Sequence, residues 1–209
     1  MSGFDLVAAA AFGYLLGGFP SAALAAKLRG VRIFEVGSGN MGAMNTARNL
    51  GLGLGLAVLA ADIAKGALAA LLGLAMGGLL GTSPDGATAL ALIAGVAAVV
   101  GHAWSPYVGF RGGKSLATAF GASLPVYLWG GLAGLVMIVA LALIFRRAEP
   151  ATWLTLLVYP LLIYLATMRA TSDQELAFAA TTSGLAIALV VALKHLSLWL
   201  ETRRSRTGD

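Results

Sequence analysis

The chain has 209 residues, of which 59% are hydrophobic and only 11% are charged, and its mean hydropathy is +0.87. A water-soluble domain carries charge on roughly a quarter of its residues, so this composition excludes a globule coated by water. In lipid, only helices and closed barrels satisfy all backbone hydrogen bonds. The apolar runs are long and continuous rather than alternating, which favours helices over a barrel. We therefore predict an all-α integral membrane protein.

The residue types that are scarce exclude several kinds of site. The chain has no cysteine, which excludes disulfides, zinc–cysteine sites, iron–sulfur clusters and a thiol nucleophile. Two histidines and nine acidic residues leave little material for a metal site, so we expect no metal and no cofactor. In a membrane chain, a net charge of +5 is typical of orientation signals and headgroup contacts rather than of nucleic-acid binding. The expected partner is the lipid bilayer, with no nucleic acid.

Apolar segments that approach the roughly 20 residues of a membrane span recur along the chain. We predict seven spans, near residues 4–27, 54–80, 87–103, 115–128, 130–145, 151–168 and 176–194. The first is interpreted as a retained span rather than a removed signal peptide, because it lacks a basic leader and a clear cleavage site. With no linker and no repeat of firm period, residues 1–209 are expected to form a single polytopic membrane domain.

The fourth and fifth predicted spans have an alternative, which is one long tilted helix over residues 115–145. The positive-inside rule decides between them, because seven spans place nearly all cations on one face. That face carries Lys27, Arg29, Arg32, Arg48, Arg111, Lys114, Arg146, Arg147, Lys194, Arg203, Arg204 and Arg206. The opposite face carries Arg169 with Asp5, Asp85, Asp173 and Glu175. We therefore predict two short helices joined near Trp129-Gly130-Gly131, an N-terminus outside and a C-terminus in the cytoplasm.

The first polar segment, residues 37–51, is a loop rich in glycine and in side-chain donors. It begins with Gly-x-Gly-x-x-Gly, and Asp62 follows at a tempting distance, but the chain has no room for the doubly wound sheet that this fingerprint needs. Glycines still let backbone N–H groups converge on an anion, and an arginine can fork onto a phosphate. The alternative is a flexible loop with a solvated arginine. The candidate anion-binding residues are Ser38, Gly39, Asn40, Gly42, Asn45, Arg48 and Asn49.

The second polar segment, residues 101–115, is expected on the same face as the first. It places two glycines between two cations, which suits a phosphate: Arg111, Gly112, Gly113 and Lys114. It is not a Walker A loop, because Val108 stands where that motif needs its first glycine. His102 is either a general base or a side chain that hydrogen-bonds a neighbouring loop.

Charged residues also occur inside the second span and in the tail. Asp62 and Lys65 share one helical face, and intramembrane charges are functional candidates by default. We favour a structural pair that orients the glycine-rich loop. The tail residues Lys194 and His195 are interpreted either as a membrane anchor, with Trp199 at the interface, or as part of a site. Glu35, Glu149 and Glu201 look like loop acids, and no carboxylate dyad is evident.

Together these segments resemble the bacterial acyl-phosphate:glycerol-3-phosphate acyltransferases, the PlsY family, closely in the first half of the chain. The matching elements, in order, are Gly18-Phe19-Pro20-Ser21; residues 37–45 and Arg48, with Met44 in place of threonine; Asp62, Lys65 and Gly66; and Gly101-His102 with Phe110 to Lys114, where Ser115 replaces a glycine. Four ordered elements at matching spacing form a specific signal.

The second half departs from the family pattern. Glu149 takes the place of a serine between the fifth and sixth spans of the family. In the tail motif His195 is retained, whereas Lys194 replaces an arginine, Leu198 replaces an asparagine, and Glu201 falls where a second arginine is expected. The alternative to an enzyme is therefore a non-catalytic phosphate- or lipid-binding membrane paralogue.

The resemblance implies a seven-helix fold and an enzyme that transfers a fatty acyl group from acyl phosphate to the 1-hydroxyl of glycerol 3-phosphate, giving lysophosphatidate for phospholipid synthesis. Neither histidine begins the His-x-x-x-x-Asp pattern of other glycerolipid acyltransferases, and acyl phosphate is already activated, so we expect direct attack by the hydroxyl.

The resemblance also implies roles for named residues. The expected catalytic residues are Arg48, His102, Lys114 and His195. The expected substrate-binding residues are Ser38, Gly39, Asn40, Gly42, Asn45, Arg111, Gly112 and Gly113, with Asp62 and Lys65 in support. The expected location is the bacterial inner membrane, in several passes, with the active site on the cytoplasmic face. This leaves room for a contact with the enzyme that supplies acyl phosphate.

Overall fold

The computed structural model describes residues 1–146, 148–170 and 173–207. Within these ranges the chain is helical and has no strand, apart from an isolated bridge between Ser105 and Arg111, which confirms the all-α class. The α-helices are α1 (Gly3–Gly18), α2 (Ser21–Lys27), α3 (Ala43–Leu50), α4 (Leu52–Leu79), α5 (Pro84–Ala103), α6 (Leu116–Ser123), α7 (Leu128–Phe145), α8 (Ala148–Ala170) and α9 (Gln174–Thr207). Two 3-10 turns, η1 (Ile33–Glu35) and η2 (Pro106–Val108), lie in the loops.

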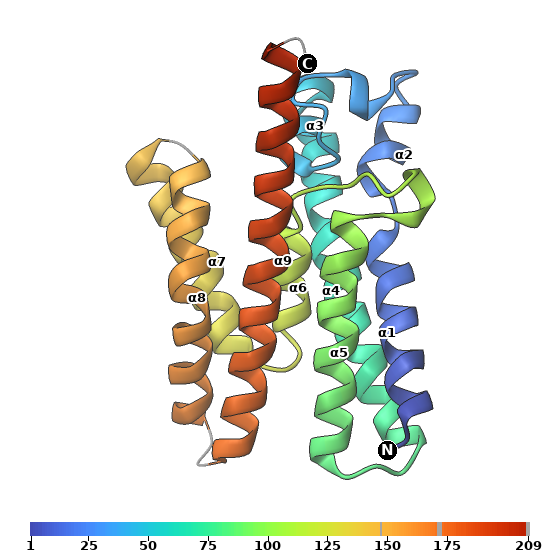
Figure 1. The fold of residues 1–209 in the computed structure, drawn as a ribbon, viewed down its shortest axis with the longest axis vertical. Coiled ribbons are helices and arrows are strands. Elements are labelled where there is room, and N and C mark those ends of the chain that lie inside the picture. Colours follow the sequence, from blue (N-terminus) through green and yellow to red (C-terminus); the bar gives the residue numbers. More distant parts are fainter. Residues whose placement is uncertain (147, 171–172, 208–209) are drawn as a thin grey trace.

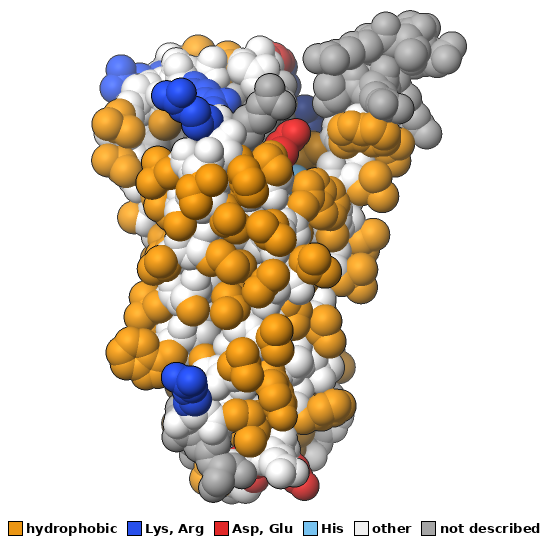
Figure 2. All heavy atoms as spheres, turned by 90° about the vertical axis from the view of Figure 1, so that its left-hand side faces the viewer, with side chains coloured by type: hydrophobic (Ala, Val, Ile, Leu, Met, Phe, Trp, Pro, Cys, Tyr) orange, Lys and Arg blue, Asp and Glu red, His pale blue; other side chains and the backbone are white. Residues whose placement is uncertain are grey.

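Six candidate membrane spans occur in the described parts of the chain. By length and composition they are Gly3–Lys27, Leu52–Leu79, Pro84–Ala103, Leu128–Phe145, Glu149–Arg169 and Gln174–Glu201. Their sides carry exposed apolar side chains over most of the molecule's height (Figure 2). The chain is a multi-span helical integral membrane protein.

The predicted fourth span differs from the structure. Residues 115–145 form two helices rather than one, as expected, but α6 has only eight residues, or about 12 Å, and is too short to cross a bilayer alone. The connection lies at residues 124–127 and not at Trp129-Gly130-Gly131. Pro125 explains the break, because it has no N–H for the next helical hydrogen bond. Gly130 and Gly131 instead lie buried in α7, where their small size admits neighbouring helices.

The two ends of the helical bundle differ in charge. Figure 1 shows the C-terminus toward one end, with α2 and α3, and the N-terminus at the other end, where α5 and α9 begin. In Figure 2 the Lys and Arg side chains gather at the first of these ends. We call it the basic end. This distribution follows the predicted one, although Arg147 and the side chains of Arg203, Arg204 and Arg206 lie outside the described part of the structure.

The N-terminal half is held together by very close helix contacts. A Cβ on Gly17 of α1 would lie 2.0 Å from the carbonyl oxygen of Ala98 in α5, so only glycine allows these backbones to approach. Pro20 then interrupts the first span and separates α1 from α2. The break turns backbone polar groups toward α4, which matters for the site.

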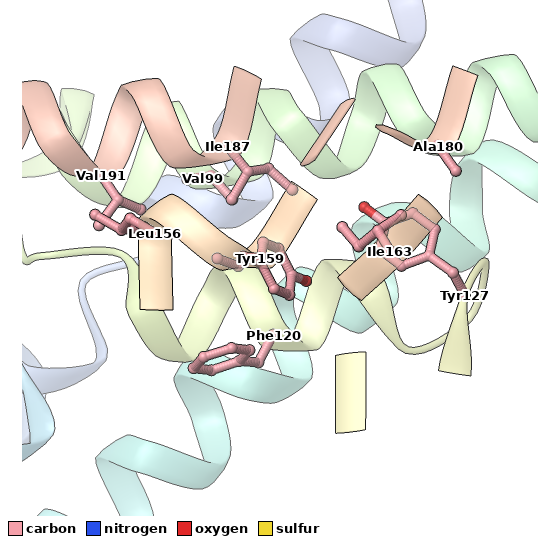
Figure 3. Close-up of a cluster of buried hydrophobic side chains, with 10 residues drawn as sticks. Val99, Phe120, Tyr127, Leu156, Tyr159, Ile163, Ala180, Ile187 and Val191 are labelled. Atoms are coloured by element: carbon pink, nitrogen blue, oxygen red, sulfur yellow. The ribbon is translucent and has the colours of Figure 1, made fainter. Parts of the chain in front are cut away.

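The C-terminal half packs around two tyrosines (Figure 3). The ring of Tyr159 in α8 meets Phe120 of α6 edge to face, at 6.0 Å between centroids, and its hydroxyl bonds that of Ser123. The hydroxyl of Tyr127 lies 3.1 Å from that of Ser183 in α9. These contacts join α6 to α8 and the start of α7 to α9.

Candidate functional site

The glycine-rich loop is ordered by one asparagine amide. Asn45, in the first turn of α3, accepts the backbone N–H of Ser38 at 3.0 Å through its Oδ1. Its Nδ2 donates to the carbonyl oxygens of Val36 at 3.1 Å and Asn40 at 3.0 Å. Asn45 therefore uses its side chain to hold the loop, whereas Ser38 is exposed and free to face a ligand.

The second loop is folded back onto the end of α5. The backbone N–H of Ser105 donates to Arg111, and that of Gly113 donates to the carbonyl of His102 at 3.1 Å. The Arg111 guanidinium lies over the ring of Phe34 in η1, 4.0 Å from its centroid, so the second loop also contacts the turn that precedes the first loop.

Gly113 is the point where the two loops meet most closely. A Cβ there would lie 2.2 Å from His102 Nε2 and 2.5 Å from the carbonyl oxygen of Met41. Since real Cβ atoms do not approach other atoms this closely, any side chain at position 113 would push the loops apart. The first loop, the second loop and the His102 ring therefore form one packed unit.

A buried polar cluster lies directly beneath this unit. The Asp62 carboxylate accepts the Ser21 hydroxyl at 2.5 Å and pairs with Lys65 Nζ at 2.9 Å. Lys65 also donates to the carbonyl of Phe19 at 3.0 Å, beside the break between α1 and α2. His102 Nδ1 lies 3.6 Å from the same Asp62 oxygen. Because Asp62 and Lys65 are almost fully enclosed, this geometry agrees with a structural pair that orients the loops.

Lys114 is the half-buried cation of the site. Its ammonium lies 4.0 Å from Glu149 at the start of α8, and its side chain is 35% exposed. Burial lowers the pKa of Lys114 below the ordinary lysine value; Glu149 opposes this effect, and the nearby positive charge of Arg48 adds to it. Arg48 itself is exposed on α3. The two predicted phosphate-binding cations therefore lie within electrostatic range of one another.

The end of α9 completes the site from the other side. His195 is buried, and its Nδ1 lies 3.0 Å from the carbonyl of Val191, while its Nε2 has no partner. Lys114 and Glu149 lie within electrostatic range of its ring. A proton on Nδ1 would satisfy Val191 and leave Nε2 as a free acceptor.

Two neighbours of the cluster were not among the expected catalytic or substrate-binding residues. Lys194 is 5% exposed and holds its ammonium over the Trp104 ring at 5.5 Å, with Arg111 in electrostatic range. Its position beside His195 in the tail motif was the available signal. Ser21 belongs to the matching Gly-Phe-Pro-Ser element but had no assigned partner until the fold placed it on Asp62.

No group of three or more acidic or histidine side chains within the described ranges is arranged to hold a metal ion. The cluster is instead rich in cations, which suits a phosphate.

Comparisons with known proteins agree with this chemistry. A family model described as glycerol-3-phosphate acyltransferase matches residues 7–201. Glycerol-3-phosphate acyltransferase 1 of Deinococcus radiodurans is 51% identical over 108 residues, which is 52% of this chain and 50% of that protein. The glycerol-3-phosphate acyltransferase of Desulforudis audaxviator is 36% identical over 203 residues, which is 93% of this chain and 90% of that protein.

Two solved structures have the same fold. Both are crystal structures of PlsY (YgiH), an integral membrane glycerol 3-phosphate acyltransferase, and each aligns with 97% of this chain and 92% of its own. The glycerol 3-phosphate form is 28% identical with a TM-score of 0.76, and the lysophosphatidic acid form is 27% identical with a TM-score of 0.77.

Proposed function

The chain belongs to the glycerol-3-phosphate acyltransferase family and is a membrane acyltransferase, and on that premise we propose that its donor is acyl phosphate and its acceptor the 1-hydroxyl of glycerol 3-phosphate. The product is lysophosphatidate. The observation that carries the proposal is the meeting of two glycine-rich loops and the cations Arg48 and Lys114 at one end of the bundle. Both substrates are phosphates, and this cluster has the donors that phosphates require.

The reaction needs one bond to form and one to break. The acceptor oxygen attacks the acyl carbonyl carbon, and the bond from that carbon to the phosphate oxygen breaks. The electron pair leaves with inorganic phosphate. Lys114 and Arg48 stabilise the negative charge on the transferring carbonyl and the leaving phosphate. Because the donor is already activated, no covalent acyl-enzyme is required.

The two histidines take different roles in this proposal. His195 Nε2 is unpaired and close to the Lys114 charge, so it orients the acceptor hydroxyl and takes its proton. His102 lies between Asp62 and Gly113, with Nδ1 3.6 Å from the Asp62 carboxylate and Nε2 against Gly113, so it holds the loops in register. This favours the second of the two alternatives that the sequence left open for His102.

The remaining candidate residues shape the phosphate site. Ser38 exposes its hydroxyl, while Asn40 and Asn45 fix the first loop. Gly39, Gly42, Gly112 and Gly113 let the loops fold tightly, and the N–H groups of Gly39, Gly42 and Gly113 donate to the carbonyls of Val36, Asn40 and His102. Arg111, held over Phe34, contributes charge at the rim.

We further propose that the basic end faces the cytoplasm of a bacterial cell, with the membrane being the inner membrane. The excess of Lys and Arg at that end supports this orientation through the positive-inside rule. The N-terminus, at the opposite end, would then lie outside. The basic end would also be the face that meets the enzyme supplying acyl phosphate.

A donor panel tests this function. The purified protein in nanodiscs is given labelled glycerol 3-phosphate with palmitoyl phosphate, acyl-CoA or acyl-carrier protein. Lysophosphatidate formed from palmitoyl phosphate alone supports the proposal. Product from a thioester donor alone refutes the choice of donor. Phosphate binding without product from any donor would identify a non-catalytic paralogue.

A further inference from the structure

Glu149 lies beside Lys114, the half-buried cation of the candidate site. It begins α8 and is largely exposed, with 78% of its side chain accessible, yet its carboxylate points toward Lys114 at 4.0 Å. Among the residues that the structure describes, another ion pair at the basic end joins the exposed Arg32 and Glu35. Glu149 is thus the acid that accompanies the half-buried cation of the site.

A negatively charged group beside Lys114 stabilises its ammonium. Its ammonium is partly removed from water and is repelled by Arg48, so an anion beside it is stabilising. When a phosphate is bound, that anion is the substrate. Before it binds, Glu149 supplies the charge.

We propose that Glu149 is an internal competitor for the substrate phosphate, which sets how tightly this enzyme binds a phosphate monoester dianion at Lys114. The inference rests on the proposed function and deepens it. A phosphate carries up to two negative charges and displaces the single carboxylate from Lys114. The exposed glutamate side chain can swing into water, so displacement costs little packing. The consequence is weaker substrate binding and easier departure of inorganic phosphate than at the same site without an acid.

The magnitude follows from the kind of ion pair. Exposed pairs of this type contribute about 0.2–1 kcal/mol, which corresponds to a change of up to about fivefold in a binding constant. Removing the Glu149 charge should therefore lower the KM for one phosphate substrate by about 1.4- to fivefold. The turnover number kcat should stay within about twofold, because the carboxylate leaves the site before the chemical step.

The test compares E149Q with E149D and with a matched control, E35Q. Glu35 is an exposed acid in η1, near the same end of the bundle, and pairs with Arg32 rather than with the site. KM is measured for glycerol 3-phosphate at saturating palmitoyl phosphate, and then for palmitoyl phosphate at saturating glycerol 3-phosphate. The two series show which substrate places its phosphate at Lys114. Each is repeated at low and high salt.

The expected result is a lower KM for one substrate in E149Q, a near-normal value in E149D and E35Q, and a difference that shrinks as salt screens the charges. Three results would overturn the inference in an enzyme that is active as wild type. They are an unchanged KM, the same decrease in E35Q, or a kcat at least tenfold lower in E149Q, which would make Glu149 a proton acceptor. An inactive wild-type protein would instead refute the proposed function.

Discussion

Replacing Gly113 with alanine should separate activity from folding. The new Cβ would lie 2.2 Å from His102 Nε2 and 2.5 Å from the Met41 carbonyl oxygen, where ordinary contacts begin near 3.4 Å. The groups must therefore move apart by about 1 Å. The His102 ring is buried against Asp62, and the Met41 oxygen belongs to the backbone, so neither group can move away without displacing its own segment of the chain. The following residue, Lys114, would be displaced with the loop.

The expected size of the effect comes from two separate costs. Overpacking of this kind destabilises a fold by about 1–3 kcal/mol, which lowers the melting temperature without preventing folding. A shift of about 1 Å in a catalytic cation can reduce kcat/KM on the order of 100-fold. Initial rates with palmitoyl phosphate and glycerol 3-phosphate in nanodiscs measure the second cost, and thermal unfolding measures the first. Gly53→Ala, which has nothing within 4 Å of the new Cβ, is the control. A G113A variant with activity within about threefold of wild type would refute the packed-loop account.

Three further results are expected. Lys114→Ala should reduce transfer by more than about 100-fold while the protein still inserts into membranes, and retained turnover would remove Lys114 from the site. Phosphate binding needs a protonated Lys114, and burial lowers the pKa of Lys114, so KM should begin to rise at a pH below the ordinary lysine pKa of 10.5. Because Glu149 raises that pKa, the E149Q variant should show the rise at a still lower pH. A rise in KM only at or above pH 10.5 would contradict the lowered pKa. Asp62→Asn should cost about 3–5 kcal/mol of stability by leaving Lys65 buried and uncompensated, with part recovered by a second change, Lys65→Met; a loss below about 1 kcal/mol in thermal unfolding would argue against a buried pair.

The sequence was most informative where one physical rule dominates. The amino-acid composition predicted that lipid rather than water surrounds the protein. The positions of Lys and Arg predicted which loops lie on the same side of the membrane, because the chain changes sides at each crossing. Residues 37–51 and 101–115 could therefore be assigned to the same end of the bundle before their contacts were known. The acyltransferase assignment came from the four ordered elements and is supported by the family match over residues 7–201.

The sequence did not predict those features of the fold that depend on how the helices pack against one another. Hydropathy places an apolar segment in lipid but does not say whether it crosses, so α6 was expected as a full span and is only eight residues long. Gly130-Gly131 suggested a turn, yet these glycines provide close helix contacts, and Pro125 ends the helix instead. In lipid, glycine serves packing as readily as turning.

Side-chain roles in the site were equally difficult to foresee. The side-chain amide of a residue such as Asn45 can either bind a ligand or hold its own loop. Only the fold shows that the Asn45 amide hydrogen-bonds the backbone of Ser38 and Asn40. His102 and His195 look equivalent in the sequence. Both are buried, and each has one ring nitrogen without a hydrogen-bond partner. They differ in their neighbours, because His102 lies against Asp62 and Gly113, whereas Lys114 and Glu149 lie within electrostatic range of His195.

Isotope exchange tests the central claim, that the acyl group passes directly between two phosphate substrates at the basic end. The enzyme is incubated with palmitoyl phosphate and radiolabelled inorganic phosphate, with and without glycerol 3-phosphate. Direct transfer predicts no label in palmitoyl phosphate when the acceptor is absent, and lysophosphatidate when it is present. Rapid labelling of palmitoyl phosphate without the acceptor would reveal a covalent acyl-enzyme and contradict the account.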